Sequence, residues 1–207
     1  MNSGPTVFIV DDDPGVRDRL RRVFESVGLK AETFSSAEEF LQAFDPSCPG
    51  CVVADVLVPR MGGLELQQQL AKMGHPIPLI VITGFPDVTT AVRAMKAGAV
   101  SVVEKPISEH ILLDSVREAL LKDTEHRVHG GQVTEIRARI ALLTGRERQV
   151  LELVVAGQTS KEIAAKLSLS SKTVETHRAQ IMNKLKAHSI AELVRLAIQY
   201  GPTRANP

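Results

Sequence analysis

Short apolar runs alternate with amphipathic stretches along residues 1–124, and several of these runs end in polar groups. The first run, at 7–10, is followed at once by Asp11, Asp12 and Asp13. Four consecutive apolar residues are typical of a strand buried on both faces, so the carboxylates stand where that strand ends. Acidic groups packed this closely repel one another, and the pattern therefore indicates a cation, Mg²⁺, among them.

Later apolar runs lead into a matching set of reactive groups. They deliver Asp55, Thr83 and Lys105 at their ends. In an open parallel α/β sheet, ligands bind beyond the carboxyl ends of the strands. Mg²⁺ prefers oxygen ligands, a carboxylate can attack phosphorus, and an ammonium can neutralise the charge that develops. The sequence therefore predicts a phosphoryl-transfer site in which Asp55 is the nucleophile.

Turn residues and capping signals divide residues 1–124 into strands and helices in alternation. Pro14 suits a first helical position, and Ser36 with Glu39 forms a capping box. Strands that alternate with helices imply right-handed crossovers and a parallel sheet covered on both faces. We expect strands at 6–10, 30–34, 51–55, 79–83 and 101–105, and helices at 14–27, 36–44, 63–73, 87–97 and 108–124.

A polar stretch follows the last of these helices and ends in Gly130 and Gly131. We expect the long helix to stop before this glycine pair, and residues 125–141 to form an interdomain linker with a short helix of its own. His126 and His129 lie one helical turn apart, but solvated linker histidines are commoner than a metal site of this kind.

Residues 142–207 have a purely helical pattern. Thr144, Thr159 and Ser189 each begin a capping box of the form S/T-x-x-E before an apolar-periodic run, which marks three helix starts. Two short helices joined by a tight turn are typical of a helix-turn-helix. We expect a leading helix at 145–156, a support helix at 160–167, a recognition helix at 171–185 and a closing helix at 189–199.

Charge separates the two regions. Residues 1–124 carry 12 Lys and Arg against 17 Asp and Glu, whereas residues 142–207 carry 10 against 5. The total of 207 residues exceeds the usual size of one domain, and a hydrophobic content of 43% is enough for buried cores. An acidic region joined to a basic one indicates different partners, and nucleic acid suits the basic region.

The sequence lacks the signals of a membrane protein or of a thiol-redox protein. No apolar stretch approaches the ~18 residues of a membrane span, and the start has no basic region followed by an apolar one. We therefore expect a soluble, cytoplasmic protein. Cys48 and Cys51 form a C-x-x-C, but the pair leads into a strand instead of opening a helix, which favours a turn and a buried strand cysteine.

Both regions resemble known families. The motifs that resemble response-regulator receiver domains are VDDD at 10–13, ADVLVPRMGG at 54–63, VITG at 81–84 and AMKAGAVSVVEKP at 94–106. Residues 143–185 resemble the LuxR-type DNA-binding domain. The combination resembles a transcriptional response regulator of the FixJ/NarL type, which acts on no separate substrate and is not an enzyme.

This resemblance implies a specific fold. The first part is a doubly wound α/β receiver domain with a five-stranded parallel sheet of flavodoxin-like order 2-1-3-4-5. The second part is an all-α, four-helix LuxR-type helix-turn-helix domain. The implied domains are a receiver at 1–124, a linker at 125–141 and a DNA-binding domain at 142–207.

The resemblance also implies a role for each acidic residue of the receiver. Asp55 is the expected phosphoacceptor and also a direct Mg²⁺ ligand together with Asp12. Asp11 is expected to act on the metal through water. Leu57 is expected to contribute its backbone carbonyl, which any side chain permits.

Two further receiver residues are expected to bind the phosphoryl oxygens, and two depart from the family pattern. Thr83 and Lys105 are the expected phosphoryl ligands, with a cis peptide bond between Lys105 and Pro106. Receiver domains usually carry an aromatic ring where this chain has Val102, and often a Phe after the Lys-Pro pair, where this chain has Ile107. A β-branched side chain has no ring to swing, so coupling between phosphorylation and the output surface is expected to be weakened or built differently.

The recognition helix is expected to read DNA with the side opposite its apolar face. By resemblance, the base-reading residues are Glu175, Thr176 and Ala179. A Glu can accept from cytosine N4, and a Thr or Ala methyl can touch the thymine methyl. Phosphate contacts are expected from Lys161, Lys172, Thr173 and Lys184.

The interpretation is therefore a regulator that a sensor histidine kinase phosphorylates on Asp55 with Mg²⁺. Phosphorylation is expected to cause homodimerisation on double-stranded promoter DNA and so to affect the transcription machinery, without any membrane contact. One alternative is a phosphorylation-independent DNA-binding regulator whose receiver serves only for dimerisation. Another is a Mg²⁺-dependent phosphohydrolase that forms an aspartyl-phosphate, which the basic helix-turn-helix argues against.

Overall fold

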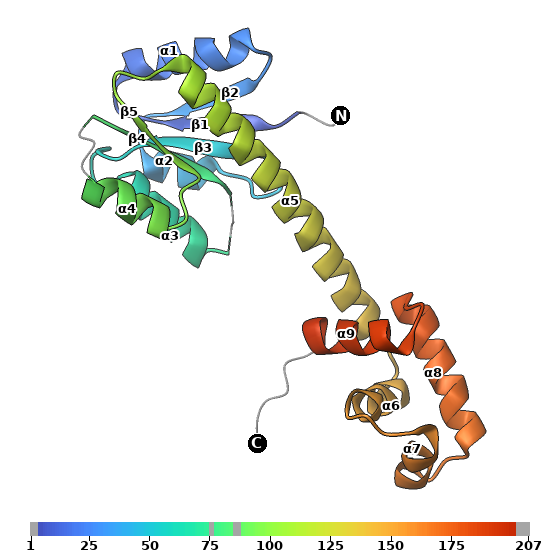
Figure 1. Cartoon of the computed structure of the whole chain (residues 1–207). Coiled ribbons are helices and arrows are strands. Elements are labelled where there is room, and N and C mark those ends of the chain that lie inside the picture. Colours follow the sequence, from blue (N-terminus) through green and yellow to red (C-terminus); the bar gives the residue numbers. More distant parts are fainter. Residues whose placement is uncertain (1–3, 75–76, 85–87, 202–207) are drawn as a thin grey trace. The chain divides into compact units, whose positions relative to one another are not determined.

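The computed structural model describes residues 4–74, 77–84 and 88–201 of the chain. The chain divides into two compact units, Met1–Arg127 and Val128–Pro207 (Figure 1). The first unit is built from strands and helices in alternation, and the second unit contains only helices in its described part. This division agrees with the change in hydrophobic pattern along the sequence.

The first unit contains a parallel sheet of five strands in the order β2-β1-β3-β4-β5, as the receiver resemblance implied. Each strand lies within one residue of its predicted bounds. The strands are β1 (Thr6–Val10), β2 (Lys30–Phe34), β3 (Gly50–Asp55), β4 (Leu79–Thr83) and β5 (Ser101–Glu104). Every residue of β1, β3 and β4 is buried, because these central strands are covered on both faces.

Within the part of this unit that the structure describes, five helices are associated with the sheet, and most agree with the predicted pattern. They are α1 (Pro14–Ser26), α2 (Ala37–Ala43), α3 (Gly63–Lys72), α4 (Val88–Lys96) and α5 (Glu109–Ala141). The predicted start of α4 at residue 87 lies outside the described residues. Ser36 caps α2 by accepting the backbone N–H of Glu39, but the predicted capping box is only half formed, because Glu39 accepts the backbone N–H of Ser35 instead of that of Ser36.

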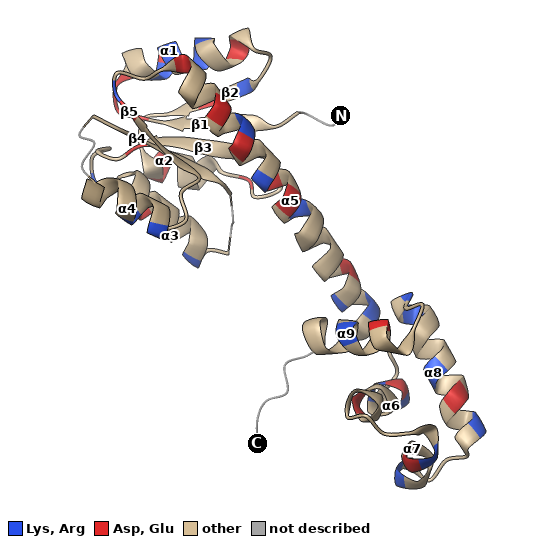
Figure 2. Cartoon of the chain, viewed as in Figure 1, with Lys and Arg blue, Asp and Glu red and all other residues tan. Residues whose placement is uncertain are grey.

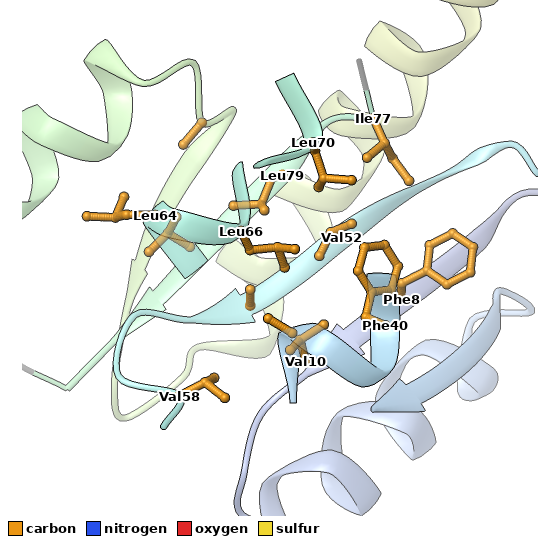
Figure 3. Close-up of a cluster of buried hydrophobic side chains, with 14 of the residues drawn as sticks. Phe8, Val10, Phe40, Val52, Val58, Leu64, Leu66, Leu70, Ile77 and Leu79 are labelled. Carbon is orange, nitrogen blue, oxygen red and sulfur yellow. The ribbon is translucent and has the colours of Figure 1, made fainter. Parts of the chain in front are cut away.

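Two apolar clusters lie on opposite faces of the sheet. On one face, Phe8 and Phe40 pack with Leu66 and neighbouring side chains from α2, α3 and α4 (Figure 3). On the other face, the side chains of α1 and α5, such as Phe24 and Leu112, cover the alternate residues of the strands. Because strand side chains point to the two faces in turn, consecutive residues of β1 and β3 enter different clusters.

The two cysteines illustrate this separation. Cys51 is buried in the cluster beneath α1 and α5, whereas Cys48 packs against the cluster beneath α2, α3 and α4. Both thiols are free, and burial raises the pKa of Cys51 to about 12. The C-x-x-C is thus a turn followed by a buried strand cysteine, with its thiols packed on different faces of the sheet.

Helix α5 differs from its prediction. We expected it to stop before Gly130 and Gly131, but it runs through both glycines to Ala141. A helix-interior glycine costs only about 1 kcal/mol relative to alanine, and no proline interrupts the stretch. Before the glycines, Arg127 is anchored by Asp123, whose Oδ2 lies 2.7 Å from the arginine Nε. The low helix propensity of the glycine pair is therefore not enough to end the helix.

In its described residues, up to 201, the second unit contains four more helices around one apolar cluster. They are α6 (Gly145–Val155), α7 (Ser160–Leu167), α8 (Ser171–Leu185) and α9 (Ile190–Tyr200). The cluster includes Val150, Ile163 and Ile181, together with Ile140 from the end of α5. These helices agree closely with the four predicted ones, and α7 and α8 form the helix-turn-helix.

In the second unit, two of the three predicted capping boxes are complete. Thr144 and Thr159 each exchange both hydrogen bonds with the glutamate three residues later. At Ser189 the box is only half formed, because Glu192 accepts the backbone N–H of His188 instead of that of Ser189. The helix start was predicted correctly, but the second bond of this box was not.

Candidate phosphorylation site and DNA-binding surface

Three charged side chains meet beyond the carboxyl edge of the sheet. Asp11 follows β1, Asp55 ends β3 and Lys105 follows β5. The ammonium of Lys105 lies 3.3 Å from Oδ2 of Asp11 and also donates a hydrogen bond to Oδ2 of Asp55. Both carboxylates are buried, at 2% and 8% exposure, so they form a small acidic site with one internal cation.

Burial and charge act in opposite directions on these groups. Burial raises the pKa of Asp11 above its ordinary value, although the backbone N–H of Asp13 and the ammonium of Lys105 favour the charged form. Burial alone lowers the pKa of Lys105, but its hydrogen bond to Asp55 and the charge of Asp11 outweigh that effect and raise the pKa overall. Burial thus disfavours the charged form of Asp11 more than the ammonium of Lys105 and the backbone N–H of Asp13 favour it.

The donor set is suited to Mg²⁺. Asp11 and Asp55 already converge on one cation, the Lys105 ammonium, and carboxylate oxygens are ligands that Mg²⁺ prefers. Asp12 is exposed, and Leu57 donates its backbone N–H to Oδ1 of Asp55 at 3.0 Å. Over residues 4–74, 77–84 and 88–201, no three His, Cys, Asp or Glu side chains are grouped to hold a metal ion. Of the three carboxylates that the sequence predicts at the metal site, the structure thus brings two together, those of Asp11 and Asp55.

The sequence analysis missed the roles of Asp13 and Arg17. Asp13 caps α1 by accepting the backbone N–H groups of Gly15 and Val16 at 2.7 and 3.3 Å. The guanidinium of Arg17 donates to the backbone carbonyls of Asp11, at 2.7 Å, and of the next residue. An aspartate directly before a proline at the first helical position was the signal for the cap.

Thr83 and Lys105 occupy adjacent strand ends. Thr83 is buried at the end of β4, and its carbonyl accepts the backbone N–H of Lys105 at 2.8 Å. The peptide bond between Lys105 and Pro106 is cis, as the resemblance implied. Val102 is half-buried in β5 and packs against the cluster shared with α4. The sheet therefore joins the acidic site to β5 through backbone hydrogen bonds, with an aliphatic side chain at the position of the usual ring.

The helix-turn-helix exposes most of the side chains predicted to contact DNA. Basic residues lie on both α7 and α8 (Figure 2). Thr173 is half-buried, and its hydroxyl and backbone N–H both bond to the cap residue Ser170. The exposed residues of the predicted set are Lys161, Lys172, Glu175, Thr176 and Ala179.

Thr176 has a specific orientation on α8. Its hydroxyl donates to the backbone carbonyl of Lys172 at 3.0 Å. This bond uses the hydroxyl proton within the helix, so the methyl group and the oxygen lone pairs are what Thr176 offers to a ligand. The geometry therefore favours the apolar contact that the sequence analysis assigned to this side chain.

Lys184 has protein partners of its own. Its ammonium lies 2.7 Å from Oε2 of the buried Glu147 and 3.3 Å from the carbonyl of Leu142. The hydrogen bond from Lys184 lowers the pKa of Glu147, because it favours the charged carboxylate. From the sequence, Lys184 was assigned to phosphate. Its contacts with Glu147 and Leu142 were not found, because these residues precede Lys184 by 37 and 42 positions in the chain.

The chain matches two protein families, one over each unit. Residues 7–117 match the family described as "Response regulator receiver domain", and residues 141–197 match "Bacterial regulatory proteins, luxR family". Together with the sheet order and the helix-turn-helix, these matches define a two-component, DNA-binding transcription regulator. The chain belongs to the response regulators that join a receiver domain to a LuxR-type domain, among which FixJ proteins are close relatives.

Relatives and solved structures extend this similarity over both units. The response regulator protein TodT of Pseudomonas putida is 42% identical over 190 residues, which are 92% of this chain and 84% of TodT. The transcriptional regulatory protein FixJ of Rhizobium meliloti is 43% identical over 205 residues, covering 96% and 98% of the two chains. The structure of the response regulator StyR has a TM-score of 0.82 at 42% identity and covers 96% of this chain and 100% of StyR.

The described helices include none that combines the length and the apolar composition needed to span a membrane.

Proposed function

We propose that this protein is a phosphorylation-activated transcription regulator that accepts a phosphoryl group on Asp55 from a sensor histidine kinase in the cytoplasm. The observation that carries this proposal is the placement of Asp55 and Asp11, both buried, on one ammonium at the carboxyl edge of the sheet. A phosphoryl group on Asp55 enters a site where Lys105 is already held to receive negative charge.

Mg²⁺ would be held by Asp12 and Asp55 directly, by Asp11 through water, and by the carbonyl of Leu57. When bound, the metal neutralises the carboxylates and the incoming phosphoryl oxygens. Two features support this assignment. Oxygens of Asp11 and Asp55 converge on the Lys105 ammonium, and the exposed Asp12 directly follows Asp11 in the chain.

Asp55, Lys105 and Thr83 have different roles in the proposed reaction. Asp55 accepts the phosphoryl group and later loses it to water, so no separate substrate is needed and the protein is not an enzyme in the usual sense. Lys105 and Thr83 bind the phosphoryl oxygens. Because Thr83 and Lys105 are joined by a backbone hydrogen bond between β4 and β5, their movement is transmitted to the helices beside β5.

The output is DNA binding by a homodimer. Helix α4 exposes Val88, Val92 and Met95, at 80%, 44% and 52% of their surface, and this apolar face suits a second receiver. In the DNA-binding domain, Glu175, Thr176 and Ala179 read bases, while phosphates are bound chiefly by the exposed Lys161 and Lys172. Two copies on an inverted repeat would then recruit or block the transcription machinery.

The proposed functional boundaries place the receiver at 1–124, the linker at 125–141 and the DNA-binding domain at 142–207. The linker includes both glycines of α5. Its last apolar residues, Ile136 and Ile140, pack on the cluster of the second unit.

The test is incubation of the full chain with acetyl phosphate, with Mg²⁺ or with EDTA. We expect intact mass to show one added phosphoryl group only with Mg²⁺, and none in Asp55→Asn. The control Asp18→Asn removes an exposed carboxylate and should be modified normally. Modification in EDTA, or in Asp55→Asn, contradicts the assignment. DNA binding and sedimentation of the same samples then test the switch.

A second candidate is a DNA-binding regulator that does not respond to phosphorylation. Val102 favours it, because an aliphatic residue there lacks the ring that usually couples the two sites. Under this alternative, Asp55→Asn and the phosphorylated wild type bind DNA equally. Under the main proposal the phosphorylated protein binds more tightly, by a modest factor because fewer contacts are coupled.

A further inference from the structure

An ion pair between a buried carboxylate and a half-buried lysine joins the start of α6 to the end of α8. Glu147 is in the first turn of α6 and is only 3% exposed, whereas Lys184 is in the last turn of α8. Oε2 of Glu147 accepts from the Lys184 ammonium at 2.7 Å and from the backbone N–H of Thr144 at 2.7 Å. One carboxylate oxygen therefore holds both the start of α6 and the end of α8.

The same lysine also reaches the segment that follows α5. Its ammonium lies 3.3 Å from the carbonyl of Leu142, one residue beyond the end of α5 at Ala141. Lys184 thus links three segments of the second unit: the residues after α5, the first turn of α6 and the last turn of α8.

This arrangement conflicts with a phosphate contact. Lys184 already has two oxygen partners, and moving it to a phosphate would leave the buried carboxylate of Glu147 without its cation. Although the Lys184 side chain is 35% exposed, Glu147 is buried, so the loss of its cation is unfavourable because an uncompensated carboxylate remains in the interior. By contrast, Lys172 is exposed in the first turn of α8 and has no side-chain partner among the hydrogen bonds and ion pairs that the structure describes.

We propose that Lys184 is a positioning residue of the recognition helix and not a phosphate ligand. Through Glu147 and the Leu142 carbonyl, it sets how α8 presents Thr176 and its neighbours to DNA. The inference rests on the proposed role of α8 as the recognition helix. As a consequence, a displacement of the segment after α5 acts on α8 directly through Lys184.

The first experiment measures binding of the full chain to a mixed-sequence DNA duplex by fluorescence anisotropy over a range of KCl concentrations. Lys172→Ala should lower the slope of log affinity against log salt by about one unit, since it removes one phosphate contact. Lys184→Met should leave that slope unchanged. If Lys184→Met lowers the slope as Lys172→Ala does, Lys184 binds phosphate and the inference is wrong.

The second experiment measures base preference by selection from a random-sequence duplex pool. Glu147→Gln keeps an acceptor for the cap of α6 but loses the charge that holds Lys184, and we expect a change in preference of about tenfold at one or more positions. The matched control is Glu162→Gln, which makes the same change in the capping box of α7, where Glu162 has no lysine partner among the described ion pairs. Equal behaviour of the two variants overturns the inference.

Two further variants separate positioning from simple loss of folding. Lys184→Arg retains a cation and should restore the wild-type preference. The double variant Glu147→Gln/Lys184→Met leaves no uncompensated charge in the domain. It is used in place of the single variant Lys184→Met if circular dichroism shows that the single variant is unfolded. A folded double variant with the wild-type base preference also refutes the inference.

An unchanged salt slope in Lys172→Ala contradicts the proposed DNA-binding face itself. The comparison of Glu147→Gln with Glu162→Gln then still tests the role of the ion pair.

Discussion

The ammonium of Lys105 lies 3.3 Å from Oδ2 of Asp11, although β3 and β4 separate the two strands that these residues follow. The same ammonium donates to Asp55, so one side chain crosses the carboxyl edge of the sheet. A change of charge at Asp55 therefore acts directly on Lys105, the residue that follows β5.

Lys105→Ala should uncouple phosphorylation from output. We expect the variant to fold and to accept a phosphoryl group with Mg²⁺, because Asp55 and the other carboxylates remain. Its DNA affinity should not change on phosphorylation, since the group that links the phosphoryl oxygens to β5 is gone. The measurement is DNA affinity before and after treatment with acetyl phosphate. Lys30→Ala, which removes an exposed lysine, is the control, and normal switching in Lys105→Ala refutes the role.

Asp11→Asn should stabilise the receiver at neutral pH. Burial raises the folded-state pKa of Asp11, so its contribution to stability is present below the unfolded pKa and is lost as pH rises through the folded pKa. Asparagine keeps an oxygen for the backbone N–H of Asp13 and avoids burying the charge. Urea unfolding at several pH values without Mg²⁺ should show a gain at neutral pH and little gain in acid.

The control for this prediction is Asp45, whose pKa is shifted in the opposite direction. The backbone N–H of Ser47 lowers the pKa of the exposed Asp45, so this group contributes stability above its unfolded pKa and loses it as pH falls through the folded pKa. Asp45→Asn should therefore be neutral or destabilising at neutral pH. A loss of stability in Asp11→Asn at neutral pH contradicts the electrostatic account of the site.

Contacts to bases and to phosphates should separate along α8. Lys172→Ala should weaken binding to all sequences alike and lower the salt slope by about one unit. Glu175→Ala or Thr176→Ala should change base preference by ~1–3 kcal/mol at one position. Thr176→Ser keeps the hydroxyl bond to Lys172 but loses the methyl, so it should behave like Thr176→Ala. A wild-type preference in Thr176→Ser shows that the methyl is not read.

The glycine pair of α5 gives a test of the continuous helix. Gly131→Ala should increase the protection of amide hydrogens over residues 125–141 by about 1 kcal/mol, because a Cβ there meets no neighbour and alanine favours helix. Gly157→Ala is the control, since Gly157 has a φ of +79° and an added side chain strains it. Hydrogen exchange that is unchanged or faster in Gly131→Ala means that α5 is interrupted at this point.

Local patterns in the sequence were sufficient for most of the secondary structure and for the main residues of the site. Apolar runs, caps and turn residues act between neighbours in the chain, so they placed the strands, the helix starts and the strand-end residues Asp11, Asp55 and Lys105. The family resemblance supplied the strand order, which hydrophobic pattern alone does not determine.

Other features depended on residues that meet only in the folded chain. The partner of Lys184 is a glutamate 37 residues earlier, and a charge count treats that lysine like any other basic residue on α8. Cys48 and Cys51 are neighbours in a motif, yet the alternation of side chains across the sheet packs them on different faces. Helix α5 continues through Gly130 and Gly131, because a glycine in a helix costs only about 1 kcal/mol relative to alanine. The sequence by itself thus determined which elements form and which groups end them, since those depend on short-range geometry. Only tertiary packing decided the partners of buried charges, because their free energy depends on atoms far away in the chain.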